Sequence, residues 1–148
     1  GLAVFHARLR DYDFRLASRR YLFGESITDS DVRLFVTLSS YERAYRPRLA
    51  EILQGEEVLH LQDFPNLWAY ARDLFQTPGF GDTIDFEQIK AHYYVVHTDL
   101  NPLSIIPKGP DLSGCLMPHG REALGGRPFG DGTAPGPVRA GEQSPHTL

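Results

Sequence analysis

The sequence contains little of what would mark a secreted, membrane-spanning or metal-binding protein. Its single cysteine, Cys115, excludes an internal disulfide and a metal site built from several cysteines, which suits a reducing compartment. No apolar run approaches the length of a membrane span, and the first residues lack the pattern of a signal peptide. The net charge of -4 gives no electrostatic basis for binding nucleic acid or an anionic membrane. We therefore expect a cytoplasmic protein without nucleic-acid or membrane partners.

What is present is typical of one ordinary globular domain. The chain has 148 residues, of which 41% are hydrophobic and 23% charged, and this is enough to bury a sizeable core. It starts on Gly1 rather than Met, and no capping residue precedes its first helical pattern. We therefore expect that it has been truncated at its N-terminus.

Residues 21–38, with the sequence YLFGESITDSDVRLFVTL, contain a complete helix start signal. Thr28 and Asp31 have the spacing of a capping box, in which each side chain bonds the backbone amide of the other residue. Ile27 and Val32 flank the box at the positions of a hydrophobic staple. These four residues predict that a helix begins immediately after Thr28.

The predicted helix is apolar in almost every direction. Such a pattern indicates burial on all sides, as the central helix of a helical domain. We expect the helix to end near Arg46, because Pro47 follows it. Gly24, in the turn before the helix, can take the positive φ that a Cβ would penalise. Arg33 lies inside the apolar pattern, so we expect it to pair with a carboxylate such as Asp73.

Helical periodicity recurs elsewhere, and no stretch alternates as a strand would. A first helix is predicted over residues 2–20, with Phe5, Leu9, Tyr12 and Leu16 on its inner face. Pro65 is suited to the first turn of another helix, which Pro78 should terminate. A last helix is predicted from residue 85 to about 97. The fold class is therefore all-α, a bundle of about four to six helices.

The composition changes after residue 108. Nine of the 14 glycines and six of the 11 prolines fall within residues 109–148. A segment with so few apolar residues cannot bury enough surface to offset its ordering entropy. We therefore predict a helical domain over residues 1–108 and an extended or disordered tail over residues 109–148, whose first part could wrap over the domain.

Several motifs resemble those of a known family in their order and spacing. They are RYLFG at 20–24, DVRLF at 31–35, FPNLWAYARDL at 64–74, PG at 78–79, IKAHYY at 89–94, NP at 101–102 and IIPKGP at 105–110. Together they are similar to the C-terminal half of glutathionyl-hydroquinone reductases, also called xi-class glutathione transferases. The resemblance covers nearly all of residues 5–110. It implies a glutathione transferase C-terminal-like helical bundle.

For this family the resemblance implies a two-domain enzyme. A thioredoxin-like N-terminal domain binds glutathione and carries a nucleophilic cysteine, and the helical domain builds the hydroquinone pocket and the homodimer contact. The cysteine removes glutathione from a glutathionyl-hydroquinone, and a second glutathione resolves the mixed disulfide. The implied partners are thus an aromatic hydroquinone and the missing domain. Glutathione, or another small thiol, is a co-substrate and not a tightly bound cofactor.

The catalytic half is missing from the chain. It contains neither a strand-rich segment nor a Cys-Pro motif, and Cys115 lies in the glycine-rich tail without a helix start to activate it. We therefore predict no catalytic residue in this chain, and expect it to be inactive alone. The alternative is a stand-alone helical module that serves only interaction or dimerisation.

The triplet His92-Tyr93-Tyr94 is the predicted substrate-binding site. A phenol can donate a hydrogen bond to a thiolate or quinol oxygen while its ring packs on an aromatic substrate. The resemblance favours Tyr93, although its phase with the apolar residues of the same helix is also that of a core residue. His92 and His97 are five residues apart, unlike an i, i+4 ligand pair, so we predict no metal site there.

Three other aromatic residues are ambiguous. Trp68 could line a pocket, but an aromatic side chain on such a helix usually serves packing. Tyr41 and Tyr45, four residues apart near the end of the central helix, fit either role.

Overall fold

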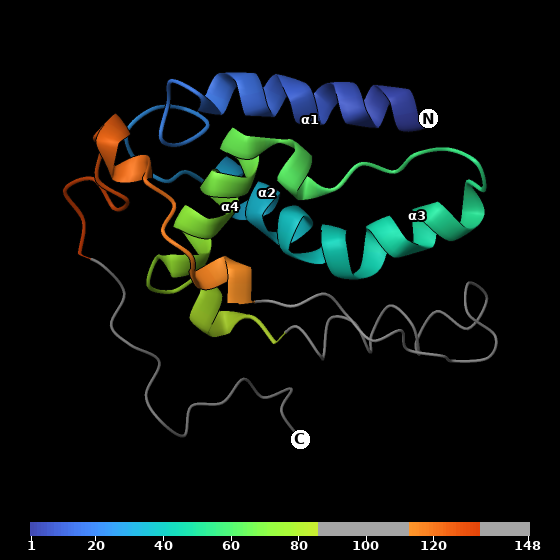
Figure 1. Cartoon of the computed structure of the whole chain (residues 1–148). Coiled ribbons are helices and arrows are strands. Elements are labelled where there is room, and N and C mark those ends of the chain that lie inside the picture. Colours follow the sequence, from blue (N-terminus) through green and yellow to red (C-terminus); the bar gives the residue numbers. More distant parts are fainter. Residues whose placement is uncertain (86–112, 134–148) are drawn as a thin grey trace.

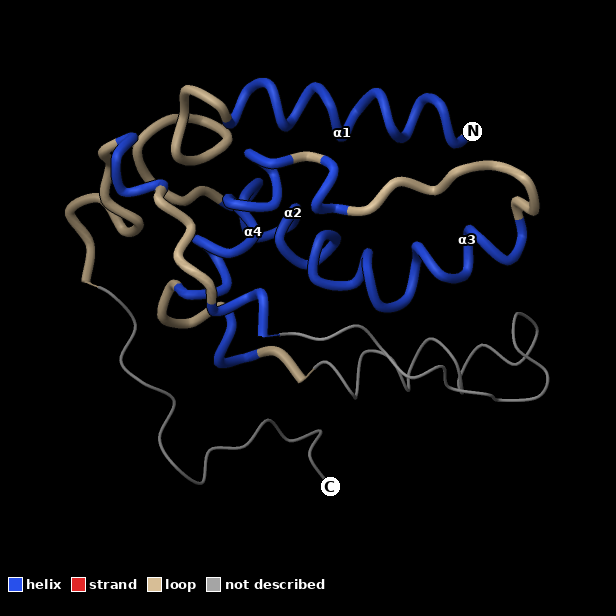
Figure 2. The backbone as a smooth tube through the Cα atoms, in the orientation of Figure 1, coloured by secondary structure: helices blue, strands red, loops and turns tan. Residues whose placement is uncertain are grey.

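The computed structural model describes residues 1–85 and 113–133, and every regular element within them is a helix (Figures 1 and 2). The α-helices are α1 (Leu2–Leu16), α2 (Asp29–Ser40), α3 (Arg46–Ile52) and α4 (Pro65–Gln76). Short 3-10 helices are η2 (Leu61–Asp63), η3 (Gly81–Thr83), η5 (Ser113–Leu116) and η6 (Arg121–Leu124). The predicted all-α fold is confirmed. In the described part of the chain, no helix has the length and apolarity to cross a membrane.

The predicted capping box of α2 is present, and its Asp31 also bonds residues outside the box. The backbone amide and hydroxyl of Thr28 both lie 2.8 Å from one carboxylate oxygen of Asp31, completing the capping box. The other oxygen accepts hydrogen bonds from the Leu22 amide at 2.9 Å and the Tyr70 hydroxyl at 2.8 Å. Asp31 is 0% exposed. Burial, and then the charge of Asp31, raise the pKa of Tyr70, so its phenol remains a donor.

The prediction that the central helix is buried on all sides is wrong. Phe35 and Leu38 are buried, but Val32 is 42% and Val36 60% exposed. Among the described elements α2 packs against α4, which lies in front of it in Figure 1. The sequence pattern therefore indicated an apolar surface as well as a core. The staple between Ile27 and Val32 stays a prediction.

Helix α4 packs against both α1 and α2, and a side chain of α1 caps its start. Pro65 opens α4 as predicted, and the amides of Asn66 and Leu67 donate to Asp13 Oδ1 at 2.7 and 2.8 Å. This carboxylate accepts hydrogen bonds from amides that have no partner inside the helix. Its negative charge also interacts favourably with the positive end of the α4 dipole. The contact fixes the relative position of α1 and α4. The periodicity of the first helix does not indicate this role of Asp13, so it was missed.

One apolar cluster joins these helices, the turn before α2 and the η2 segment. Its buried members are Leu9, Leu16, Tyr21, Leu22, Phe35, Leu38, Tyr41, Leu61, Phe64, Leu67, Tyr70, Ala71 and Leu74. The predicted inner face of α1 is confirmed at Leu9 and Leu16, whereas Tyr12 is 36% exposed. The turn before α2 contains Gly24 at φ 131°, the positive value that was expected.

Residues 113–133, here called the C-terminal segment, are attached to the helices through Arg121. Its guanidinium is 4% exposed and donates hydrogen bonds to the carbonyls of Leu16 at 3.0 Å, Arg19 at 2.6 Å and Arg20 at 2.8 Å. These carbonyls belong to the end of α1 and the following turn, where helical partners run out. The segment is thus packed and contains two 3-10 helices, which differs from a disordered tail. The boundary predicted at residue 109 stays a prediction.

The expected ion pair between Arg33 and Asp73 does not form. Asp73 is 2% exposed and receives two hydrogen bonds from Arg20, at 2.9 and 3.1 Å, with Arg121 at 3.9 Å. Arg33 instead pairs with Asp29 one helical turn earlier, at 2.6 Å on the exposed surface. The partner was predicted wrongly because the Arg33 side chain is 80% exposed, whereas Asp73 is buried.

Candidate functional site

The helix that contains α2 does not end before Pro47 but continues to Ile52 through a π-helical turn, η1 (Tyr41–Tyr45). The predicted end near Arg46 is therefore wrong. In a regular α-helix the ring of Pro47 would clash with a carbonyl four residues earlier. Here the Arg46 amide donates to the Tyr41 carbonyl, five residues back, and Pro47 lies in the first turn of α3, where no amide is needed.

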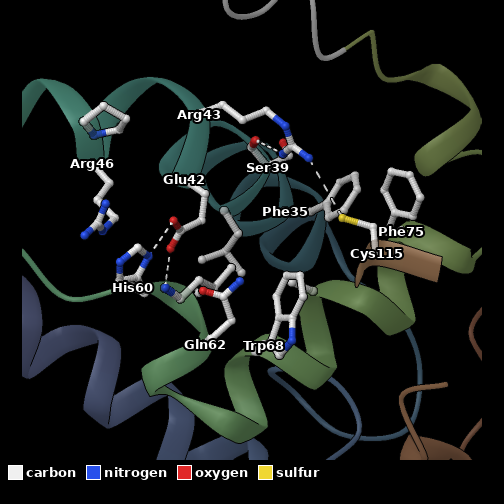
Figure 3. Close-up of a pocket in the computed structure, with 14 residues that line it drawn as sticks. Phe35, Ser39, Glu42, Arg43, Arg46, His60, Gln62, Trp68, Phe75 and Cys115 are labelled. Atoms are coloured by element: carbon white, nitrogen blue, oxygen red, sulfur yellow. Dashed lines mark hydrogen bonds and ion pairs between the residues drawn. The ribbon is translucent and has the colours of Figure 1, made fainter. Parts of the chain in front are cut away.

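A cavity of about 270 Å³ opens beside this π turn (Figure 3). Its walls are formed by α2, η1, the start of α3, the η2 segment, α4 and η5. The apolar lining residues are Phe35, Leu38, Leu61, Trp68, Ala71 and Phe75. The polar lining residues include Glu42, Arg43, Arg46, His60, Gln62 and Cys115. A mostly apolar cavity with a few polar groups is the usual form of a small-molecule site.

The side chain of Glu42 fixes one side of the cavity. It is 14% exposed, and its carboxylate accepts a hydrogen bond from the Leu61 amide and contacts His60 Nδ1 at 3.2 Å. On the same side Arg46 Nε donates to the Val58 carbonyl at 3.1 Å. These contacts join η1 and the start of α3 to residues 58–61. The cavity wall is therefore held by hydrogen bonds as well as by packing.

Arg43 and Cys115 lie together at another edge of the cavity (Figure 3). Arg43 is 7% exposed, its Nη1 donates to the Ser39 carbonyl at 3.1 Å, and its Nη2 lies 4.0 Å from Cys115 Sγ. Gln76 Nε2 donates to the Cys115 carbonyl at 2.9 Å, which holds η5 against α4. The thiol of Cys115, for which the sequence indicated no activation, thus lines the cavity.

A second hollow of about 1030 Å³ lies between α1 and α2, and we call it the α1–α2 groove. Two aromatic side chains at this groove are strongly exposed, Phe14 by 84% and Phe23 by 66%. Its charged lining residues are Arg8, Arg15, Arg19, Arg33 and Asp11. Large exposed aromatic residues beside a hollow of one dominant charge are typical of an interaction surface.

The predicted substrate-binding triplet, His92, Tyr93 and Tyr94, lies outside the described residues, as does His97. The structure therefore neither joins these residues to the cavity nor separates them from it. Within residues 1–85 and 113–133, no group of three potential ligands could hold a metal ion.

Of the ambiguous aromatic residues, Trp68 lines the cavity, whereas Tyr41 has a structural position. Tyr41 is 1% exposed and its hydroxyl donates to the Leu59 carbonyl at 2.6 Å, while burial raises its pKa to about 12. The sequence missed Glu42 and Arg43 as cavity residues. A proline inside an otherwise continuous helical pattern was the available signal, because π turns often accompany such irregularities and functional sites.

Comparison with known proteins identifies the class. No protein-family model matches the chain. A glutathione transferase from Gordonia bronchialis is 57% identical and superimposes with a TM-score of 0.79 over 89% of this chain and 40% of its own. The xi-class glutathione transferase from Natrialba magadii is 36% identical, with a TM-score of 0.76 over 85% of this chain and 38% of its own. The chain therefore has a glutathione transferase-like helical fold.

A curated relative makes the assignment more specific. Glutathionyl-hydroquinone reductase YqjG of Escherichia coli is 35% identical over 109 residues, which are 72% of this chain and 31% of the relative. Its glutathione-bound structure superimposes with a TM-score of 0.70 at 31% identity. The chain is thus a homologue of glutathionyl-hydroquinone reductases and resembles their C-terminal domain, as its motifs indicated. It spans about a third of the length of the curated relatives it matches.

Proposed function

We propose that the chain is the substrate-binding and dimerisation domain of a glutathione-dependent enzyme of the glutathionyl-hydroquinone reductase type. The observation that carries this proposal is the similarity to such reductases along 72% of the chain but only 31% of the relative. In this proposal the catalytic cysteine and the glutathione site belong to a thioredoxin-like domain outside these residues. Glutathione is the co-substrate, and Tyr93, with His92 and Tyr94, faces the aromatic hydroquinone.

The α1–α2 groove supports a role beside another domain. Exposed Phe14 and Phe23 leave apolar surface in water, and a neighbouring domain would bury it. Val36, 60% exposed on α2, adds to this exposed apolar surface. A folded domain that leaves this much aromatic surface uncovered is expected to associate, so we also expect the isolated chain to form a homodimer. Sedimentation equilibrium tests this expectation, and a stable monomer at all concentrations would contradict it.

Binding of a hydroquinone tests the substrate-binding role. In isothermal titration calorimetry, unsubstituted hydroquinone should bind the wild-type chain. Tyr93→Phe should raise the dissociation constant about tenfold, because one hydrogen bond to the quinol is lost. Tyr12→Phe is the matched control, since this tyrosine of α1 is 36% exposed and is not a residue of the proposed site. No binding, or equal binding by wild type and Tyr93→Phe, would contradict the assignment. The first result would favour the alternative of a stand-alone interaction module.

A further inference from the structure

We propose that the α1–α2 groove binds a short acidic amphipathic helix of a partner protein or domain. The inference rests on the proposed function in one respect, namely that this surface meets a neighbour. It adds the chemistry of that neighbour: a helix whose apolar stripe is flanked by carboxylates. The shape of the groove, its charge and its exposed aromatic side chains each support this partner.

The groove is a trough between the faces of two helices. Its lining residues on α1 include Arg8, Asp11 and Arg15, and those on α2 run from Ser30 to Thr37, both sets at helical intervals of three and four. A groove of this kind receives the apolar face of a third helix. Arg8 to Arg15 spans about 10 Å, which matches about two turns of such a helix. Strand addition is a poorer fit, because no strand is present among the described elements.

The charge of the groove favours an acidic partner. Among its described lining residues there are four arginines and one carboxylate, that of Asp11. The chain as a whole has a net charge of -4, so this positive surplus is local and does not follow from composition. A hollow with one dominant sign of charge attracts groups of the opposite sign, and guanidinium groups pair well with carboxylates.

The four arginines are exposed and only weakly engaged within the chain. Arg8 and Arg33 each pair with an aspartate of their own helix, at 3.6 and 2.6 Å, and every side chain in these pairs is at least 70% exposed. Such surface pairs contribute little and can be exchanged for pairs with a partner. Arg15 donates a hydrogen bond of 3.4 Å to the Leu22 carbonyl, and within the described residues neither Arg15 nor Arg19 forms an ion pair.

The aromatic side chains at the groove supply the apolar half of the contact. Phe14 is 84% and Phe23 66% exposed, so a partner that covers both rings removes a large apolar area from water. The Arg15 guanidinium lies 5.8 Å from the centroid of the Phe23 ring. Positive charge is therefore placed directly beside the apolar contact. An acidic amphipathic helix presents the complementary arrangement, with leucine-like side chains next to carboxylates.

Two other occupants fit the groove less well. Two copies of the chain that met groove to groove would oppose arginine to arginine, which is unfavourable. The expected homodimer contact would then use another surface, such as that around Val36 on α2. An anionic membrane would attract the arginines, but a broad lipid surface does not fill a trough between two helices. Both occupants are distinguished from an acidic helix in the experiment below.

A pair of synthetic peptides tests the proposal. Both are alanine-based, fluorescein-labelled helices of about 15 residues with the same stripe of leucines, flanked in one by glutamates and in the other by lysines. In fluorescence anisotropy, the glutamate peptide should bind with a dissociation constant on the order of 10 μM. The lysine peptide should bind at least tenfold more weakly. Because the whole chain is negatively charged, general attraction would favour the lysine peptide, so the opposite preference reports the groove.

Substitutions at exposed positions then locate the binding. Arg15→Gln and Arg19→Gln should each raise the dissociation constant of the glutamate peptide about threefold. Arg10→Gln is the matched control, because it removes the same charge from an exposed position of α1 outside the groove. Phe14→Ala should weaken both peptides about threefold. Val4→Ala, at a position of α1 that is 63% exposed and does not line the groove, should weaken neither.

Several results would overturn the proposal. These are equal or tighter binding of the lysine peptide, an effect of Arg10→Gln as large as that of Arg15→Gln, and no binding of the glutamate peptide at about 200 μM protein, 20-fold above the expected constant. Dissociation of a homodimer by the glutamate peptide in sedimentation equilibrium would place a second copy in the groove. Displacement of the peptide by vesicles that contain phosphatidylserine would assign the groove to a membrane surface.

The same protein distinguishes this proposal from the proposed function. Saturating glutamate peptide should leave the calorimetric titration with hydroquinone unchanged, because the groove and the predicted substrate site are made of different residues. If the peptide does not bind while hydroquinone does, only the chemistry of the partner is wrong. If hydroquinone does not bind while the peptide does, the substrate-binding role is wrong and the assignment of the groove stands.

Discussion

Two buried carboxylates hold this fold together, and they differ in where their partners come from. Asp31, 0% exposed, is held by the turn that precedes its own helix and by Tyr70 of α4. Asp73, 2% exposed, is held by Arg20, and Arg121 of the C-terminal segment lies 3.9 Å away. The first cluster is largely local in sequence, and the second joins three distant parts of the chain.

This difference has a consequence for stability. The cluster around Asp31 forms when the turn and α2 form, so it should belong to the cooperative core. The cluster around Asp73 includes Arg121 of the C-terminal segment, whose other hydrogen bonds to the helices and the turn before α2 use mainly its backbone carbonyls. We therefore expect substitution of Asp31 to destabilise the whole domain. Substitution of Arg121 should first detach the C-terminal segment from the helices.

The largest effect is expected from Asp31→Ala. The substitution removes the helix cap and leaves the Leu22 amide and the Tyr70 hydroxyl buried without an acceptor. The free energy of unfolding should fall by about 4 kcal/mol, as measured by urea denaturation. Asp29→Ala is the control, because that side chain is 78% exposed and its pair with Arg33 contributes at most about 0.5 kcal/mol. Similar losses from both substitutions would contradict the role of Asp31.

Arg121→Gln should have the next largest effect, about 3 kcal/mol, because it removes a buried charge that satisfies the carbonyls at the end of α1. Limited proteolysis should cut within residues 113–133 before the helices are attacked. Arg127→Gln, in the same segment but 77% exposed, should change neither measurement. Cleavage that begins in α2 in the Arg121 variant would show that the two clusters are not separable.

Two neighbouring buried tyrosines sharpen the account of Asp31. Tyr70→Phe should cost about 1.5 kcal/mol, because the hydroxyl donates to a charged acceptor at 2.8 Å. Tyr21→Phe should be close to neutral or stabilising, because the Tyr21 hydroxyl is buried and has no hydrogen-bond partner among the described residues. Thermal denaturation of the two variants compares them directly, and an equal loss would argue against a specific contribution of the Tyr70 bond.

The smallest effect concerns His6, which lies in α1 away from both clusters. Its Nε2 accepts a hydrogen bond from the Leu59 amide at 3.3 Å, and burial, followed by the charge of Arg10, lowers its pKa from 6.5. Below pH 6.5 the unfolded chain binds a proton that the folded state resists, so stability should fall as the pH decreases.

His6→Gln should flatten this part of the pH dependence when urea midpoints are compared between pH 7.5 and 5.5, about one unit either side of the ordinary histidine pKa. If the urea midpoint of His6→Gln changed with pH as much as that of the wild type, other groups would cause the pH dependence.

The sequence predicted those features whose causes lie within a few residues. The capping box at Thr28, the positive φ of Gly24 and the start of α4 at Pro65 each follow from local chemistry and are confirmed. The pairing of Asp73 with Arg20 could not be predicted, because it depends on how α4 turns relative to α1. For the same reason Asp13 was not recognised as the cap of α4.

The candidate sites were predictable to different degrees. Trp68 was considered as a pocket residue, but Glu42 and Arg43 enter the cavity through a π turn that periodicity does not reveal. The exposed face of α2 was misread because an apolar pattern does not distinguish a core from a surface awaiting a partner. Tyr93 stays a prediction, since it rests on the resemblance and lies outside the described residues.

The proposal that the catalytic cysteine lies outside these residues can be tested most directly by turnover. The chain is incubated with glutathione and a glutathionyl-hydroquinone, and release of the hydroquinone is followed by chromatography. The account predicts no rate above that of buffer with glutathione, from a chain that nevertheless binds hydroquinone. Turnover at an enzymatic rate would contradict it, and Cys115→Ser, which removes the single cysteine of the sequence, would show whether that thiol is responsible.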